Sequence, residues 1–260
     1  MGNQLLPCLV LTAVMASVGL ADEWKKSFPV SGKSDLRVNV SDGSISIHSW
    51  DRNEVGARVT TDGWQIRPSE VRVTDHQGGD RVEIEVRTPR FSSFSHHSVH
   101  VDLLVPHELR AELHTGDGSI SAKDLKGEFN FSTGDGGIEA DAVDGTLDVK
   151  TGDGHIRASG RWDQVDLRTD DGAVEAAAGA GSKMSSSWRI NTGDGHITLH
   201  LPDNFAADLD AHTGDGKVTV DFPVTLMGSV GGSEIRGKLN GGGPSLQVRT
   251  GDGSIHLQRL

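Results

Sequence analysis

Apolar and polar residues alternate through the middle of the chain in short runs that recur every nine residues. Glycines fall on this grid at Gly118, Gly127, Gly136, Gly145, Gly154 and Gly172, and Asp163 is the one exception. The second and fourth residues after each grid point are apolar, as in Ile120 and Ala122. Because alternate residues of a strand share one face, each nine-residue half predicts a turn followed by a short strand with one buried side.

Two such halves make an 18-residue coil that opens with Thr-Gly-Asp-Gly. The motif starts at Thr115, Thr133 and Thr151, continues as Thr-Asp-Asp-Gly at Thr169, and returns at wider spacings at Thr192, Thr213 and Thr250. A fixed period of this length is typical of repeat proteins, whose units pack mainly on their neighbours. Residues 111–260 therefore predict an all-β, β-solenoid-like stack of two-strand coils, with loops where the spacing widens.

Stacking makes specific predictions about side chains, since equivalent positions lie about 4.8 Å apart in paired strands. One inward column should contain Ile120, Ile138, Ile156 and Val174, and a second should contain Phe129, Leu147 and Val165. Trp188 should also point inward, whereas the pattern leaves Trp162 undecided. We expect Asp-Gly to supply a positive-φ turn at each corner, and the threonines to form a hydroxyl ladder.

Residues 22–110 carry a different pattern. Residues 36–50 look like one degenerate repeat, and alternating runs follow at 71–73, 82–86 and 99–105. We expect an antiparallel β region here that covers the open end of the stack.

Residues 1–21 predict a signal peptide. An uncharged, mostly apolar run from Leu5 to Leu20 precedes a small-x-small cleavage site that ends at Ala21. An uncleaved anchor is the alternative. Cys8 is the only cysteine, so cleavage would leave no thiol. The prediction is an exported protein, periplasmic, cell-surface or extracellular, with no membrane insertion of the mature chain.

The composition restricts the classes of partner that the protein could bind. Aromatic residues make up 5% of the 260 residues, there are 34 glycines and no tyrosine, and the net charge is −12. Thin, turn-rich β structure suits this composition better than a large globular core. The acidic balance argues against nucleic acid or an anionic membrane, which both select clustered Lys and Arg.

The repeat unit xLxVxTGDGxIxA, the opening PVSGKSDLRV, the strand that ends in Val105-Pro106, and the closing LNGGGPSLQVRTGDGSIHL resemble a bacterial family of β-strand-repeat proteins labelled "putative adhesins". The similarity runs from about Phe28 to the C-terminus. It implies a secreted or envelope-associated β-solenoid-like protein, and it implies no known activity and no catalytic residue.

The motif aspartates are the candidate binding residues. They should form an outward ladder of Asp117, Asp135, Asp153, Asp171, Asp194, Asp215 and Asp252. The favoured interpretation is a turn in which each Asp accepts a hydrogen bond from its own backbone, with no cofactor. A calcium-binding β-roll is the alternative, although its nonapeptide places the Asp two residues before the inward aliphatic residue, where this chain has Gly118.

Other candidate chemistry is weak. His96, His97 and His100 lie close together in a predicted strand, and a solvated face is favoured over a metal site. No GxSxG elbow, HExxH motif or phosphate loop is present. We therefore expect a non-enzyme with a binding or structural role, its partner an envelope glycan or surface protein, or further copies of itself. A polysaccharide-active β-helix enzyme is the rival hypothesis.

Overall fold

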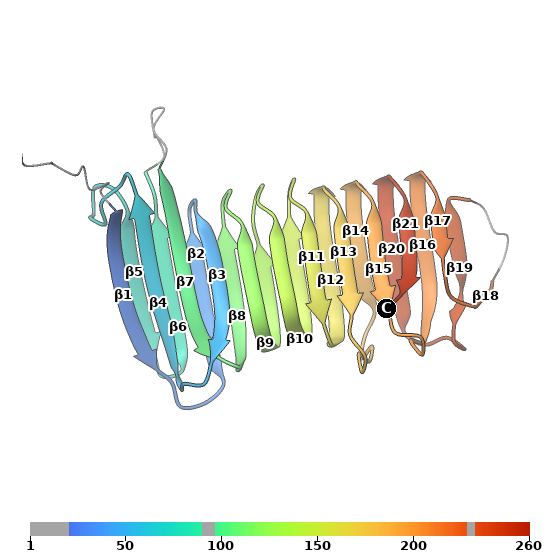
Figure 1. Ribbon diagram of the computed structural model, residues 1–260, viewed down its shortest axis with the longest axis horizontal. Coiled ribbons are helices and arrows are strands. Elements are labelled where there is room, and N and C mark those ends of the chain that lie inside the picture. The colour runs from blue at the N-terminus through green and yellow to red at the C-terminus, as the bar shows by residue number, and fades with distance from the viewer. Residues whose placement is uncertain (1–20, 90–96, 228–231) are drawn as a thin grey trace, which may run out of the picture.

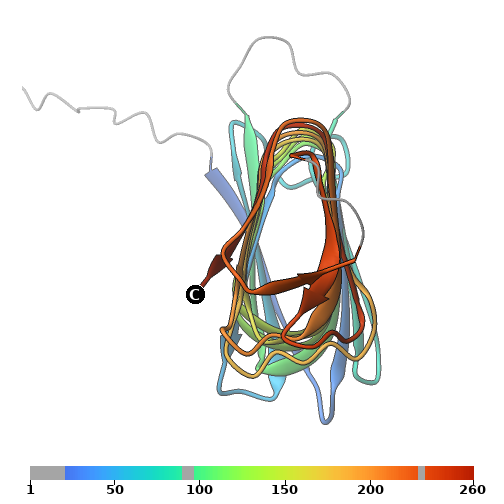
Figure 2. The ribbon, with the colours of Figure 1, turned by 90° about the vertical axis from the view of Figure 1, so that its right-hand side faces the viewer.

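The computed structural model describes residues 21–89, 97–227 and 232–260. Within them the chain forms one continuous 21-stranded sheet and no α-helix. The strands stack along one long axis (Figure 1), and viewed along that axis the coils superimpose as a flattened oval (Figure 2). The all-β, solenoid-like prediction is confirmed. The predicted signal peptide lies outside the described residues except for Ala21.

The strands have the following bounds: β1 Ala21–Pro29, β2 Ser34–Val40, β3 Ser44–Trp50, β4 Glu54–Asp62, β5 Arg72–Gly78, β6 Arg81–Arg87, β7 Ser98–Pro106, β8 Glu108–Thr115, β9 Ile120–Ser132, β10 Ile138–Thr151, β11 Ile156–Gly160, β12 Trp162–Asp171, β13 Val174–Ala178, β14 Trp188–Asp194, β15 Ile197–Leu201, β16 Ala207–Asp215, β17 Val218–Val220, β18 Val224–Leu226, β19 Glu234–Leu239, β20 Ser245–Asp252 and β21 Ile255–Arg259. β9 and β10 are 13 and 14 residues long. They pass through one corner of the oval without a break.

Parallel, in-register pairing builds the middle of the stack. Ile120 pairs with Ile138, Ile138 with Ile156, and Ile156 with Val174. The second column likewise pairs Phe129 with Leu147 and Leu147 with Val165. All seven side chains are at most 2% exposed, so each large one contributes about 1.5–3 kcal/mol of burial. Both predicted columns are confirmed.

The corner opposite the motif is filled by residues that the nine-residue pattern did not assign. Leu125 and Val143 are buried there. In the next coil Trp162 occupies this same corner, and its Nε1 donates a hydrogen bond to Val143 O at 2.9 Å. The ladder shifts register between Gly145 and Thr146, where Asp163 is the extra residue, which explains its place as the exception on the glycine grid. Trp188 is fully buried, as predicted.

The order of coils departs from the order of the chain at the C-terminal end. β20 lies between β14 and β16, and β21 lies between β15 and β17, all parallel. The coil that opens at Thr250 is therefore inside the stack, and the segment from β16 to β19 covers it. Antiparallel β18 and β19 close this end.

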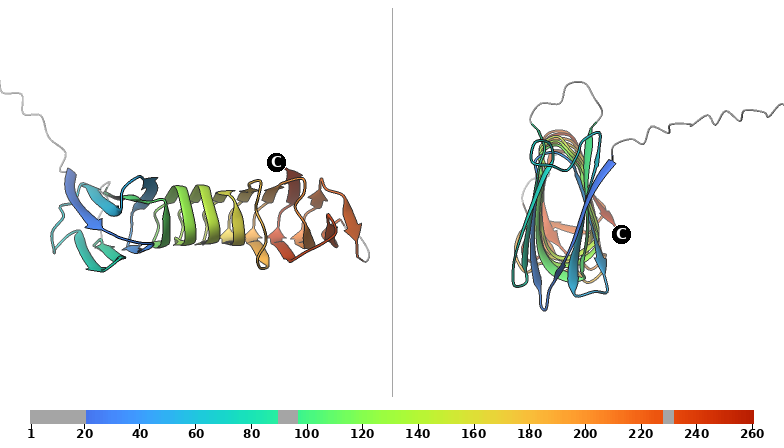
Figure 3. Two further views of the ribbon diagram at one scale, coloured as in Figure 1. Left: turned by 90° about the horizontal axis from the view of Figure 1, so that it is seen from below. Right: turned by 90° about the vertical axis from the view of Figure 1, so that its left-hand side faces the viewer.

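The N-terminal residues combine two kinds of pairing. β2 and β3 pair in parallel with β8 and β9, and on their other side with β6 and β7. β1 and β4, β4 and β7, and β5 and β6 are antiparallel. β1 forms the outermost strand of this end (Figures 1 and 3). The degenerate repeat is thus a coil of the stack, and the antiparallel strands lie beyond it.

Candidate functional site

The motif corner holds neighbouring coils together through its threonines. Each motif threonine is buried, and its hydroxyl donates to a glycine carbonyl of the adjacent coil. Thr133 Oγ1 lies 2.7 Å from Gly118 O, and Thr151 Oγ1 lies 2.8 Å from Gly136 O. The same bond recurs from Thr115, Thr169, Thr192, Thr213 and Thr250. The predicted column of threonines is confirmed, since Thr151, Thr169 and Thr192 pair in register, but each hydroxyl donates to the backbone of the preceding coil and not to another threonine.

The second motif glycine is needed because the coils touch there. A methyl group on Gly136 would lie 2.1 Å from Gly118 O. The expected positive φ is absent at the second motif glycine of the regular coils, Gly118, Gly136, Gly154 and Gly172, whereas Gly195, Gly216 and Gly253 of the later motifs have it. Close backbone approach, rather than turn type, fixes glycine at this position.

The seven candidate aspartates lie in single file along this corner, and all are exposed. The aspartates that belong to paired strands are in register. Asp171 pairs with Asp194, and Asp252 pairs with both Asp194 and Asp215. Among the described residues, none of the seven carboxylates accepts a hydrogen bond, so the predicted bond to the turn backbone is absent. In the same part of the chain, no group of three His, Cys, Asp or Glu side chains could hold a metal ion.

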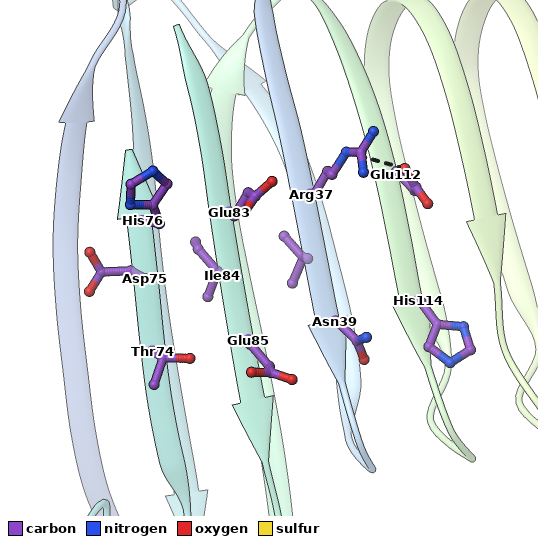
Figure 4. Close-up of a pocket in the computed structure, with 11 residues that line it drawn as sticks. Arg37, Asn39, Thr74, Asp75, His76, Glu83, Ile84, Glu85, Glu112 and His114 are labelled. Atoms are coloured by element: carbon purple, nitrogen blue, oxygen red, sulfur yellow. Dashed lines mark ion pairs between the residues drawn. The ribbon is translucent and has the colours of Figure 1, made fainter. Parts of the chain in front are cut away.

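A shallow polar recess of about 410 Å³ lies on the outer face of β5, β6, β2 and β8 (Figure 4). Pairing aligns two outward rows across these strands, His76–Glu83–Arg37–Glu112 and Thr74–Glu85–Asn39–His114. Arg37 Nε is 3.4 Å from Glu112 Oε2. Carboxylate, imidazole, amide and guanidinium groups side by side provide both donors and acceptors. The sequence did not reveal this recess, because β2 is distant in sequence from β6 and β8.

A charged cluster lies on the same outer face in the middle of the stack. Asp166 is 6% exposed and accepts hydrogen bonds from Arg168 and Arg189, including a 2.7 Å bond from Arg168 Nη2. Partial desolvation raises the pKa of Asp148 above its ordinary value, and the neighbouring Asp166 charge raises it further. Hydrogen bonding to Asp166 raises the pKa of Arg168. The ion pair between Arg189 of β14 and Asp166 of β12 links two neighbouring coils.

The N-terminal histidines occupy different places. His96 lies outside the described residues. The His97 ring stacks on Trp64 with centroids 4.7 Å apart. His100 faces outward, where Nδ1 is 2.5 Å from Ser44 Oγ and Nε2 is 3.2 Å from Asp102 Oδ1. The contact between His100 and Ser44 was not predicted, and the Ser-His-Asp row lies on an outer sheet face, where Asp102 borders a recess.

The fold, the coil-to-coil use of the motif and the shallow outer recess define an extended β-repeat protein of the solenoid-like class. The chain belongs to the Toastrack DUF4097 family, whose model matches residues 25–258. This confirms the resemblance expected from the repeat unit and the closing glycine-rich segment. No curated protein matches the chain. Within the described residues, no helix has the length and apolar character needed to cross a bilayer.

Three solved structures are similar over most of their length. A "putative cell adhesion protein" from Clostridium sporogenes is 15% identical, with 92% of this chain and 99% of that chain covered and a TM-score of 0.41. A "putative adhesin" from Bacteroides fragilis is 9% identical, with 92% and 97% covered and a TM-score of 0.37. A "putative lipid binding protein" from Parabacteroides distasonis is 13% identical, with 92% and 98% covered and a TM-score of 0.39. Their different labels assign no ligand to this chain.

Proposed function

We propose that this is an exported, non-enzymatic β-repeat protein that binds through its outer surface at the cell envelope or outside the cell. One observation carries the proposal. In Thr-Gly-Asp-Gly, the threonine and the second glycine are used in contacts between coils, whereas the aspartate is exposed and its carboxylate accepts no hydrogen bond from any residue that the structure describes. An exposed carboxylate that recurs without a hydrogen bond to another described residue is available to a partner outside the molecule.

The proposed partner is an envelope glycan or a surface protein with cationic or hydroxyl groups along its length. The aspartate row follows the long axis, so repeated weak contacts to one extended partner would add up. Carboxylates that lack internal partners accept hydrogen bonds from hydroxyl groups and pair with cations. The apolar run of residues 5–20 supports export, and the exposed aspartate row supports a role for the outer surface.

Location is tested first. The full chain is produced in a bacterial host, the cells are fractionated, and mass spectrometry determines the N-terminus of the purified protein. Protein confined to the cytoplasm with residues 1–21 intact would contradict export.

Binding is tested with immobilised envelope glycans and envelope protein extracts. A variant with Asp117→Asn, Asp135→Asn and Asp153→Asn should lose retention while keeping its circular dichroism spectrum. The matched control is Glu139→Gln with Glu175→Gln, which removes exposed carboxylates from an outer sheet face instead. Equal retention of both variants and the parent protein would refute the role of the aspartate row.

The rival enzymatic hypothesis makes a separate prediction. A polysaccharide lyase would generate unsaturated ends that absorb ultraviolet light when it is incubated with acidic polysaccharides. We expect no such absorbance from the purified protein.

A further inference from the structure

The two ends of the stack differ in the sheet edge that they present. At the C-terminal end, the described edge strands β17 and β18 have three residues each. At the N-terminal end, β1 has nine residues, and in the described residues it pairs only with β4. One layer runs β3–β7–β4–β1 and the other β2–β6–β5, so β1 extends one strand beyond the opposite layer. A long unpaired edge is a template for another strand.

The residues along this edge have a self-complementary order. Residues 22–26 read Asp-Glu-Trp-Lys-Lys, two acids and two bases on either side of one tryptophan. If two β1 strands pair antiparallel about a two-fold axis at Trp24, Asp22 lies opposite Lys26 and Glu23 lies opposite Lys25. In this register even-numbered residues lie opposite even-numbered ones, and odd-numbered opposite odd-numbered. Since alternate residues of a strand share a face, the two side chains of each pair lie on the same face of the combined sheet, as antiparallel pairing requires.

We propose that the free edge of β1 pairs antiparallel with β1 of a second copy of this chain, joining two stacks by their N-terminal ends. This interface is independent of the proposed surface binding. The joined sheet would continue from one stack into the other and remove the exposed edge. The product is a symmetric, closed dimer of about double length, because a two-fold contact uses the same surface on both copies.

The side chains around β1 identify the pairs that set the register. Asp22 Oδ2 accepts a hydrogen bond from Ile66 N at 2.8 Å, and Lys26 pairs with Asp75, so both already have partners within the chain. Glu23 and Lys25 face outward with side chains 37% and 61% exposed and form a 2.9 Å ion pair, and Glu23 also pairs with Arg58 of β4. In the dimer, Glu23 of each copy would pair with Lys25 of the other copy, so each charge would keep a partner of opposite sign. The partly buried Trp24 would meet its symmetry mate on the axis.

Neighbouring registers are disfavoured by charge. An axis at Lys25 sets that lysine opposite its own copy and leaves Glu23 opposite Ser27. An axis at Glu23 sets two glutamates opposite each other. Like charges directly opposite in a sheet are destabilising. Lysines at an edge ordinarily protect against pairing, and only the register centred on Trp24 matches both of these lysines with acids.

A charge exchange tests the proposal. The exported protein is purified and its N-terminus is determined, and sedimentation is measured from low to high micromolar concentration. We expect a dimer whose maximum dimension in small-angle X-ray scattering is nearly twice that of one stack. Glu23→Lys alone and Lys25→Glu alone should each weaken dimerisation roughly tenfold or more, because two opposite-charge pairs become like-charge pairs. An equimolar mixture of the two variants should recover dimerisation as a heterodimer.

Lys150→Glu is the matched control, since it changes the charge of an exposed lysine in the middle of the stack and should dimerise like the parent. A parent protein that stays monomeric throughout the concentration range overturns the proposal. Dimers that survive both single variants place the contact elsewhere, and a mixture that fails to recover dimerisation rejects the register. Failure of glycan or envelope-protein binding would leave all these results unchanged.

Discussion

The tight contact between coils at the second motif glycine makes Gly136→Ala a direct test of how this stack is held together. The added methyl group would lie 2.1 Å from Gly118 O, 2.5 Å from the carbonyl carbon of Gly118 and 2.9 Å from Ser119 N. All three atoms belong to the backbone of the adjacent coil, so no side-chain rotation relieves the clash. The two coils must separate locally by about 1 Å to reach ordinary van der Waals distance.

Separation also strains the hydrogen bonds at the corner. Thr133 Oγ1 donates to Gly118 O at 2.7 Å, and Thr151 Oγ1 donates to Gly136 O at 2.8 Å. Overpacking costs about 1–3 kcal/mol, and a weakened buried hydrogen bond adds about 0.5–1.5 kcal/mol. A total of about 2–4 kcal/mol lowers the Tm of a protein of this size by about 4–16 °C.

Thermal unfolding followed by far-ultraviolet circular dichroism measures this loss, with Gly137→Ala as the control. At Gly137 the three atoms nearest to an added methyl group all belong to the ring of His155, at 2.6–3.1 Å, and that side chain is exposed and can rotate. Ser119 and Ala173 occupy the same slot in other coils. Gly137→Ala should therefore change the Tm by no more than about 2 °C. Equal Tm values for the two alanine variants would refute coil contact as the reason for glycine at position 136.

Four further outcomes follow from the same structure. Thr151→Val should lower the free energy of unfolding by about 1–3 kcal/mol, because it leaves Gly136 O without its buried donor, and Thr151→Ser should lose less; equal losses would contradict this. The folded-state pKa of Asp148 is raised above its ordinary value of 3.8, so ionised Asp148 destabilises the fold and the penalty disappears as the pH falls through the raised pKa. Asp148→Asn should therefore raise the Tm at pH 7 by about 1–3 °C, and a difference from the parent that persists unchanged at pH 3 would be inconsistent with this. Calcium or a chelator should shift the Tm by less than about 1 °C if the aspartates bind no structural calcium; a rise that saturates with calcium would favour the β-roll alternative. Backbone amides of β20 and β21 should exchange with deuterium as slowly as those of β14 and β15, and more slowly than those of β18, since their coil lies inside the stack.

The interior of the stack was predictable because one 18-residue period fixes two columns at once. Once Ile120 faces inward, the 18-residue period places Ile138 and Ile156 in the same column. The columns extend further than predicted, since Ile45 pairs with Ile120 and Ile255 pairs with both Ile197 and Val218. The contacts made by the motif were not predictable. A glycine required by close approach and a glycine required by positive φ look identical in sequence.

The candidate surfaces were harder to predict, because they depend on which strands are neighbours. The recess in Figure 4 exists because β2 pairs in parallel with β6 on one side and β8 on the other. The sequence suggested strands at 82–86 and 36–50 without their order in the sheet. β1 lies next to the predicted signal peptide and has no repeat signature, so its place at the edge of the sheet was visible only in the structure.

The inserted C-terminal coil shows why repetition limits the prediction of coil order. Thr192, Thr250 and Thr213 each donate to a motif glycine of the preceding coil in the stack, so any motif coil presents the same contact surface to any other. Coil order is then decided by the lengths and closing strands of the intervening segments, not by the motif. The same equivalence means that a contact common to all coils cannot distinguish one partner from another. In the proposed function, the aspartate row would supply the binding that all coils share, and selectivity would come from outward positions that differ between coils, such as those around Asp166 and the N-terminal recess.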